Sequence, residues 1–173
     1  MALTDAEFRL EALRTHRHDV LNALQLIRAY IQLQRPDAAV KVIDRTATWL
    51  QSFALWQSKI RTPHPEELLL VTSMCSRIWL AESQTGMEVF PDETGAVIRT
   101  LQDLNEWATL NEQYFGISLH RRSEREQRNS KEAIETDLVI VIYPDKETHI
   151  EWTSPTDYPI DVYLHQDFAE YLF

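Results

Sequence analysis

Residues 10–31 read LEALRTHRHDVLNALQLIRAYI, and this stretch decides the fold of the N-terminal third of the chain. Apolar residues recur in it at alternating intervals of three and four, which predicts one long amphipathic helix. The predicted inner stripe consists of Leu10, Leu13, Arg17, Val20, Leu24, Ile27 and Ile31, with Leu21 widening it. Thr4 and, three residues later, Glu7 predict a capping box at the start of this helix.

A second helix follows the segment Gln34-Arg35-Pro36-Asp37. Proline disfavours helix at the residue before it and suits the first turn of a new helix, so this segment predicts a short turn and an antiparallel hairpin. The second stripe consists of Ala39, Val42, Thr46, Trp49, Phe53, Trp56 and Ile60, with Ile43 and Leu50 beside it.

The apolar arc on each predicted helix is wider than one partner helix covers. We therefore expect two hairpins to pair about a two-fold axis, as a homodimer with a four-helix bundle. The alternative is that residues 65–173 cover the excess within one chain.

The two prolines of Arg61-Thr62-Pro63-His64-Pro65 predict a boundary between a helical hairpin, residues 1–62, and a C-terminal α/β domain, residues 63–173. In the second domain we expect helices from Pro65 to about Ser83 and from Ala96 to about Gln113. The expected strands are residues 87–90, 115–119, 138–143, 150–152 and 160–164, and the β-branched run of 138–143 suits the middle of a sheet. The predicted fold class is α+β, with helices on one face of a mostly antiparallel sheet.

Composition narrows the function classes. The 173 residues are 44% hydrophobic with a formal net charge of -10, which is typical of a globular protein and argues against nucleic acid or anionic lipid as the main partner. The lone cysteine, Cys75, excludes an internal disulfide, and we expect it to be inert core. No apolar run is long enough for a signal peptide or a membrane span, so the sequence predicts a cytoplasmic protein without a membrane partner.

Glycine is scarce: Gly86, Gly95 and Gly116 are the only three, and they are scattered. Loops that bind nucleotide phosphates need clustered glycines, because their backbone must approach the phosphates closely. We therefore expect no ATP site and no tightly bound cofactor. His64 and His165 have no ligand spacing around them, so no metal site is expected either.

Arg17-His18-Asp19 lies in the middle of the first predicted helix, where His18 should be exposed at the edge of the bundle. Asn22 follows one turn later on the same face and Gln25 extends the polar strip. Neutral imidazole is a nucleophile that can accept a phosphoryl group. Arg17 could neutralise the phosphoryl charge, Asn22 could donate a hydrogen bond, and Asp19 could hold the imidazole tautomer.

Two other interpretations of these residues remain open. Asp19 and Asn22 also fit an ordinary solvated helix face. His16, two residues before His18, is a rival nucleophile that we expect on a different face, beside the dimer seam.

The segment RHDVLNALQLI, residues 17–27, resembles the RHD-x-x-N-x-L-Q-x-I signature of the phosphoacceptor helix in two related groups. These are the sporulation initiation phosphotransferase B family of histidine phosphotransferases and the citrate-type sensor kinases. The second helix, the proline linker and the short α/β tail match the layout of the first group. Outside residues 17–27 and the linker, the resemblance is one of layout alone.

The resemblance implies a phosphotransferase enzyme of a sporulation phosphorelay. By position, His18 would be the phosphoacceptor, flanked by Arg17, Asp19, Asn22 and Gln25. It would take the phosphoryl group from an aspartate of one response regulator receiver domain and pass it to another, and Mg²⁺ would come with the regulator.

The tail would resemble a kinase ATP-binding domain that has lost its nucleotide site, so Asn105 and Asn111 are interpreted as helix surface rather than as magnesium ligands. The alternatives are a non-catalytic dimeric scaffold that binds and gates response regulators, and an autokinase with an unconventional nucleotide site.

Overall fold

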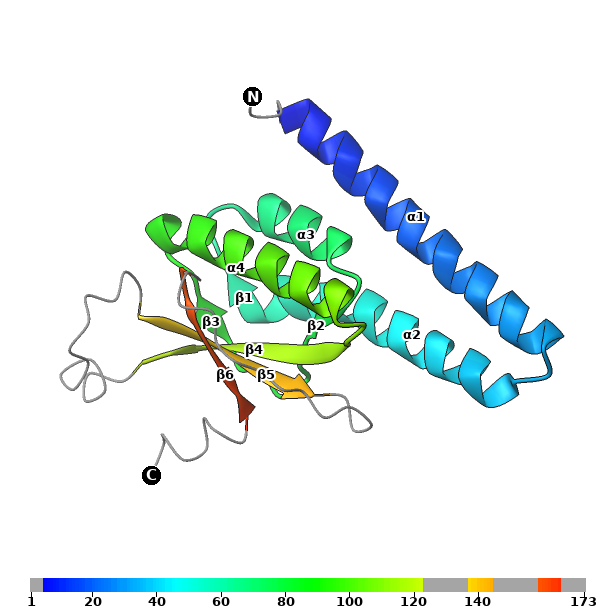
Figure 1. Ribbon diagram of the computed structural model, residues 1–173. Helices are drawn as coiled ribbons and strands as arrows, with labels where there is room; N and C mark the ends of the chain where they lie inside the picture. The colour runs from blue at the N-terminus through cyan, green and yellow to red at the C-terminus, as the bar shows by residue number, and fades with distance from the viewer. Residues whose placement is uncertain (1–4, 123–136, 145–158, 166–173) are drawn as a thin grey trace.

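The computed structural model describes residues 5–122, 137–144 and 159–165 (Figure 1). Its N-terminal part is the predicted antiparallel hairpin of α1 (Asp5–Gln32) and α2 (Pro36–Lys59). Pro36 is the first residue of α2, as expected from its fixed φ, and Gln34 makes the turn with a φ of 56°. The proposed capping residue Thr4 lies outside the described residues.

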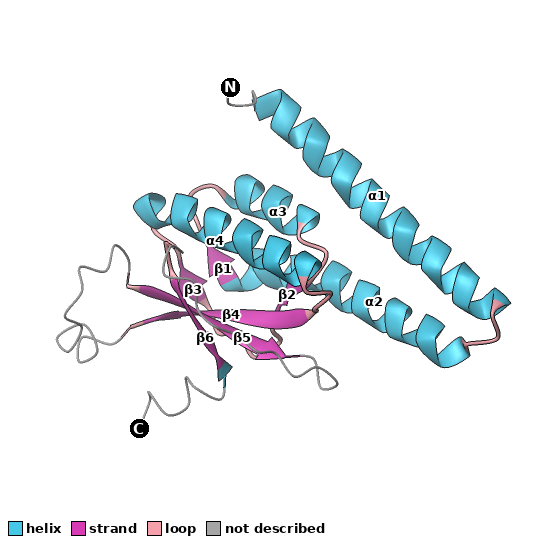
Figure 2. Ribbon diagram, viewed as in Figure 1, coloured by secondary structure: helices cyan, strands magenta, loops and turns pink. Residues whose placement is uncertain are grey.

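A four-stranded sheet with helices on one face forms the rest of the described fold (Figure 2). The two helices are α3 (Pro65–Met74) and α4 (Pro91–Leu110). The strand order is β2-β4-β5-β6, comprising β2 (Ile78–Leu80), β4 (Phe115–Arg121), β5 (Leu138–Pro144) and β6 (Asp161–Leu164). Two further strands, β1 (Ile60–Arg61) and β3 (Met87–Glu88), pair in parallel as a separate two-stranded sheet. The α+β class and the central place of residues 138–143 are confirmed.

The prediction of a mostly antiparallel sheet is wrong. Only β4 and β5 run antiparallel in the four-stranded sheet, whereas β2 pairs with β4, and β5 with β6, in parallel. The chain reaches β4 from β2 through α4, and such a helical crossover brings it back in the same direction.

Two helix boundaries also differ from the prediction. The helix from Pro65 ends at Met74 rather than near Ser83, because Ile78–Leu80 pairs with β4 and sheet formation overrides local preference. The next helix begins at Pro91 rather than Ala96, since the Glu93 carboxylate accepts the backbone N–H of Phe90, 2.9 Å away, and caps the first turn. The predicted strand 150–152 lies outside the described residues.

One core joins the foot of the hairpin to the C-terminal domain. Trp56, near the end of α2, and Ile60, the first residue of β1, belong to the same buried cluster as Leu101 of α4 and Ile140 of β5. This part of the hairpin is therefore packed inside the second domain, and the division at residue 62 remains a prediction.

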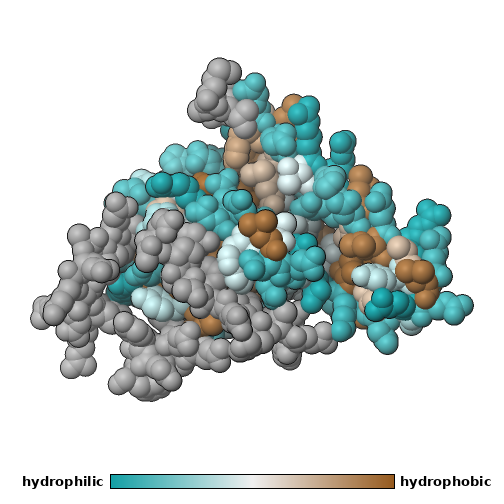
Figure 3. Space-filling model, viewed as in Figure 1, coloured by the Kyte–Doolittle hydropathy of each residue, from teal (hydrophilic) through white to brown (hydrophobic). Residues whose placement is uncertain are grey.

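The hairpin buries one side and leaves the other exposed. Ala12 is fully buried and His16 half-buried, on the side of α1 that packs on α2 and α3. The predicted inner stripe of α1 is not on that side: most of it, Arg17 included, is exposed within one chain. The large exposed apolar side chains of the hairpin are Leu10, Leu13, Leu21, Leu24, Leu26, Ile31, Leu33, Val40, Ile43 and Leu50. Figure 3 shows hydrophobic side chains gathered over the free end of α1 and α2.

Candidate functional site

His18 stands on the exposed surface of α1, with 72% of its side chain accessible to solvent. It lies in the middle of a helix of 28 residues whose backbone hydrogen bonds fix the position of its Cα. An exposed ring on a rigid helix is open to a group presented by another molecule.

Two side chains of the same helix contact the His18 ring. Asp19 Oδ1 lies 3.3 Å from Nδ1, and Asn22 Nδ2 lies 3.2 Å from Nδ1 and 3.3 Å from Nε2. If Nδ1 carries the proton and donates it to Asp19, then Nε2 keeps its lone pair and is the nucleophilic nitrogen. The arrangement supplies a nucleophile, a carboxylate that orients it and an amide donor beside it.

Arg17 and Gln25 are also exposed on α1. No hydrogen bond or ion pair joins either side chain to His18 among the residues that the structure describes. Arg17 precedes His18 directly and Gln25 follows two turns later, so both side chains are available to a molecule that docks on this face.

His16 lies in a packed interface within the chain rather than beside a dimer seam. Its ring centroid is 5.0 Å from that of Trp49 and 5.7 Å from that of Phe53, and Nδ1 lies 3.3 Å from the carbonyl oxygen of Ser73. These contacts join α1 to α2 and α3. Half-buried between two aromatic rings, His16 is less accessible than His18 to a second protein.

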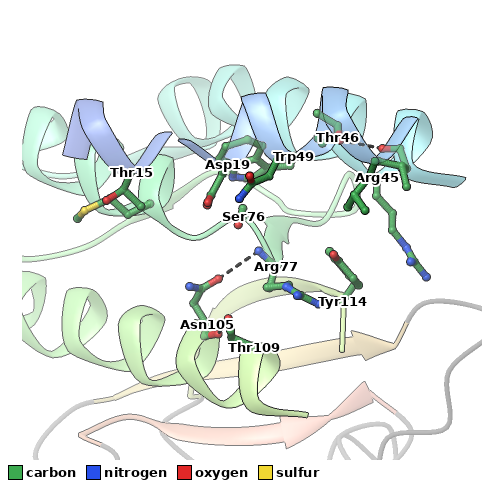
Figure 4. A pocket seen from close by; sticks show the side chains of 15 residues that line it. Thr15, Asp19, Arg45, Thr46, Trp49, Ser76, Arg77, Asn105, Thr109 and Tyr114 are labelled. Atoms are coloured by element: carbon green, nitrogen blue, oxygen red, sulfur yellow. Dashed lines mark hydrogen bonds between the residues drawn. The ribbon is translucent and has the colours of Figure 1, made fainter. Parts of the chain in front are cut away.

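A cavity of ≈ 400 Å³ opens beside the His18 contacts and is lined by Asp19 and Asn22. Figure 4 shows Asp19 among its lining residues. On its other walls are Arg45 of α2, Arg77 and Tyr114. The guanidinium carbons of the two arginines lie 4.5 and 4.4 Å from the centroid of the Tyr114 ring, within cation–π range.

No pattern in the sequence predicts this cavity. Its lining residues come from all four helices and two connecting segments, and no spacing along the chain relates them. Asn105 was interpreted as helix surface, which is wrong: it is half-buried, lines the cavity, and its Oδ1 accepts the backbone N–H of Arg77. Asn111 is exposed at the end of α4, as expected.

Cys75 is buried directly after α3, at 2% exposure. Burial, together with the nearby charge of Asp19, raises the pKa of its thiol to about 12. The thiolate is the reactive form, so Cys75 is inert, as predicted.

His120 belongs to β4, which extends to Arg121 rather than ending at residue 119 as expected. Its Nε2 lies 2.7 Å from Ser118 Oγ on the same strand. Burial and the neighbouring His165 lower the pKa of the His120 ring.

Within the described ranges, no helix has the length and apolar character to cross a membrane. In the same residues, no group of three or more His, Cys, Asp or Glu side chains is arranged to hold a metal ion.

Comparison with known proteins gives one match. Residues 2–52 match the family model described as sensor kinase SpoOB-type, alpha-helical domain. The hairpin is therefore similar to a SpoOB-type helical domain. The match spans α1 and most of α2, and therefore includes His18, Asp19 and Asn22.

No curated protein and no solved structure matches the chain. The similarity of residues 2–52 to this family suggests a domain derived from sensor kinases that serves phosphotransfer or dimerisation. The partners that such a domain suggests are proteins of two-component signalling.

Proposed function

We propose that this protein is a histidine phosphotransferase that relays phosphoryl groups between aspartates of response regulators through a phosphohistidine at His18. The observation that carries the proposal is the exposed His18 ring, with Asp19 and Asn22 beside it, on a helix of the SpoOB-type domain. The family description favours a sporulation phosphorelay as its setting.

The transfer step uses the geometry of the ring. The lone pair on His18 Nε2 attacks phosphorus in the aspartyl phosphate of the donor regulator. The P–N bond forms as the P–O bond breaks, and the aspartate carboxylate leaves with the electron pair. The imidazole becomes positively charged while Nδ1 keeps its proton, and the Asp19 carboxylate at 3.3 Å stabilises that charge. The reverse step on a second regulator releases the neutral ring.

The other side chains position the phosphoryl group. Asn22 donates to a phosphoryl oxygen, and Arg17 supplies a positive charge next to the ring. We assign Mg²⁺ to the acidic pocket of the regulator, where it would neutralise the transferring group. Positioning and charge neutralisation account for most of the rate in phosphoryl transfer, so a rigid exposed imidazole is enough.

The experiment is incubation of the protein with a receiver domain labelled at its aspartyl phosphate, followed by mapping of the labelled residue. We expect an acid-labile label on His18 that a second receiver domain removes. His18→Gln should fold normally and take up no label.

Three outcomes would contradict the proposal. Binding of the receiver domain without any label would indicate the scaffold function instead. Label that persists in His18→Gln would move the chemistry to His16 or another residue. Labelling by ATP in the absence of a regulator would indicate an autokinase.

A further inference from the structure

We propose that the cavity between the hairpin and the C-terminal domain is a binding site for a small organic anion, and that its occupant acts on His18. The cavity is lined by Arg45, Arg77 and Tyr114, and also by Asp19 and Asn22. Figure 4 shows Asp19 and Arg45 on the helical layer above Arg77 and Tyr114. Its volume of ≈ 400 Å³ lies in the range of small-molecule sites, about 300–1,000 Å³.

The charge of the cavity indicates an anion. Its ionisable lining residues include two arginines and one carboxylate, whereas the whole chain has a net charge of -10. Local positive charge in an acidic protein concentrates small anions at that point of the surface. Guanidinium groups bind carboxylate and phosphate oxygens through two parallel hydrogen bonds.

The two arginines are held in place before any ligand arrives. Both guanidinium groups lie against the Tyr114 ring, at 4.5 and 4.4 Å, so less side-chain entropy is lost when an anion binds. The backbone of Arg77 is also fixed, because its N–H donates to Asn105 Oδ1 at 3.1 Å. The Nδ2 group of Asn105 is a further donor among the lining residues.

The remaining walls indicate that the anion carries an apolar part. Leu26, Val42 and Met74 line the same cavity, and Trp49 contributes an aromatic ring. A mixture of apolar walls and a few converging polar groups is typical of sites for small organic ligands rather than for inorganic ions.

The cavity shares two residues with the His18 site. Asp19 and Asn22 line it and also contact the His18 ring. An anion bound there changes the electrostatic environment of Asp19 and competes for the amide of Asn22. The effect on phosphotransfer rests on the proposed function, whereas binding itself does not.

The test uses phenyl phosphate and benzoate as probes, with benzyl alcohol as a neutral molecule of similar size, each titrated by calorimetry and by NMR. We expect at least one of the two anions to saturate the protein with a Kd of about 1 mM or tighter, and benzyl alcohol not to bind. Arg77→Gln should weaken binding about tenfold or more. Tyr114→Phe, which keeps the ring, should bind as well as the original protein, and Tyr114→Leu should bind less well.

Arg28→Gln is the matched charge control, because Arg28 is an exposed arginine of α1 outside the cavity. It should leave the Kd unchanged. No saturable binding of either anion, equal binding of benzyl alcohol, or equal weakening in Arg28→Gln would overturn the proposal.

The link to His18 has its own readout. At saturation with the probe, the NMR signals of the His18 ring should shift in the original protein and not in Arg77→Gln, and unshifted signals would refute the link. His18→Gln should still bind the probe. Failure of phosphotransfer with retained probe binding would therefore reject the proposed function and leave the anion site standing.

Discussion

The chemistry proposed for His18 depends on contacts within one helix. Asp19 follows directly and Asn22 comes one turn later, so both reach the ring without help from another element. The helix also turns His16 toward Trp49 and Phe53, which fixes the rotation of α1 about its axis. With His16 turned toward α2, the side chain two residues later, that of His18, lies on a different face of α1 and is exposed.

Asn22→Ala should slow phosphotransfer about 10- to 100-fold, because a hydrogen-bond donor to the transferring group is lost. The measurement is the rate of labelling by a phosphorylated receiver domain under single-turnover conditions. Gln25→Ala is the matched control on the same helix face, and it should change the rate less than Asn22→Ala does. Equal effects of the two substitutions would show that the Asn22 contact has no special role.

The His18 site and the cavity differ in how far the sequence predicts them. The exposed His18 with Asp19 and Asn22 beside it follows from helix periodicity, since all three residues lie on one predicted helix. The cavity with Arg45, Arg77 and Tyr114 does not, because it exists only once the four helices and the segments before β2 and β4 have packed together.

At the scale of elements, an ion pair between the buried Glu93 of α4 and the partly exposed Arg121 joins α4 to β4. Arg121 of β4 donates to both carboxylate oxygens of Glu93 at 2.9 Å, and Glu93 also accepts the Phe90 N–H that caps α4. Burial alone would raise the pKa of Glu93, but the hydrogen bonds from Arg121 and Phe90 outweigh it and the net shift is downward.

Glu93→Gln should lower the free energy of unfolding by about 1–3 kcal/mol at pH 7, because Arg121 loses its carboxylate partner. A lowered pKa in the folded state means that Glu93 stabilises the fold above the unfolded pKa of about 4.3, and that this contribution is lost as the pH falls through the folded value. The difference between Glu93→Gln and the original protein should therefore be constant from pH 7 to about pH 5 and shrink at lower pH.

The measurement is urea unfolding as a function of pH. Glu106→Gln, an exposed position on the same helix, is the control and should have little effect. A stability difference for Glu93→Gln that does not depend on pH would contradict the assigned ion pair.

Element boundaries were harder to predict than the elements themselves. Residues 78–80 continue the apolar pattern of α3, yet they form an edge strand because β4 offers them backbone partners. The pattern within the segment is compatible with helix or strand, and a contact with residues 115–117, far along the chain, decides between them.

At the scale of the whole molecule, the chain leaves its hairpin half covered. The stripe of α1 that the sequence placed inside a bundle is largely exposed, with Leu13 at 63% and Leu24 at 57%. On α2, Val40, Ile43 and Leu50 are exposed as well. Within one chain, the described residues of the C-terminal domain therefore do not cover these side chains, and the homodimer remains our proposal for what does.

Leu24→Glu should convert a dimer into monomers, raising the dissociation constant about 100-fold or more, because a charge would have to be buried at the seam. Light scattering after size-exclusion chromatography measures the mass. Gln57→Glu adds the same charge at an exposed site near the end of α2 and should leave the dimer intact. A monomeric original protein, or a dimeric Leu24→Glu, would refute the proposal.

The burial of Cys75 has a practical consequence. It is the only thiol in the chain, and its sulfur packs beside the carbonyl oxygen of Leu101, deep in the shared core. A thiol reagent can reach it only when that core opens, so the rate of modification by an aromatic disulfide should track the free energy of opening. Leu101→Ala, which removes neighbouring core volume, should speed the reaction, and equal rates would contradict this packing. The modification rate of this single thiol therefore reports how often the core of the protein opens to solvent.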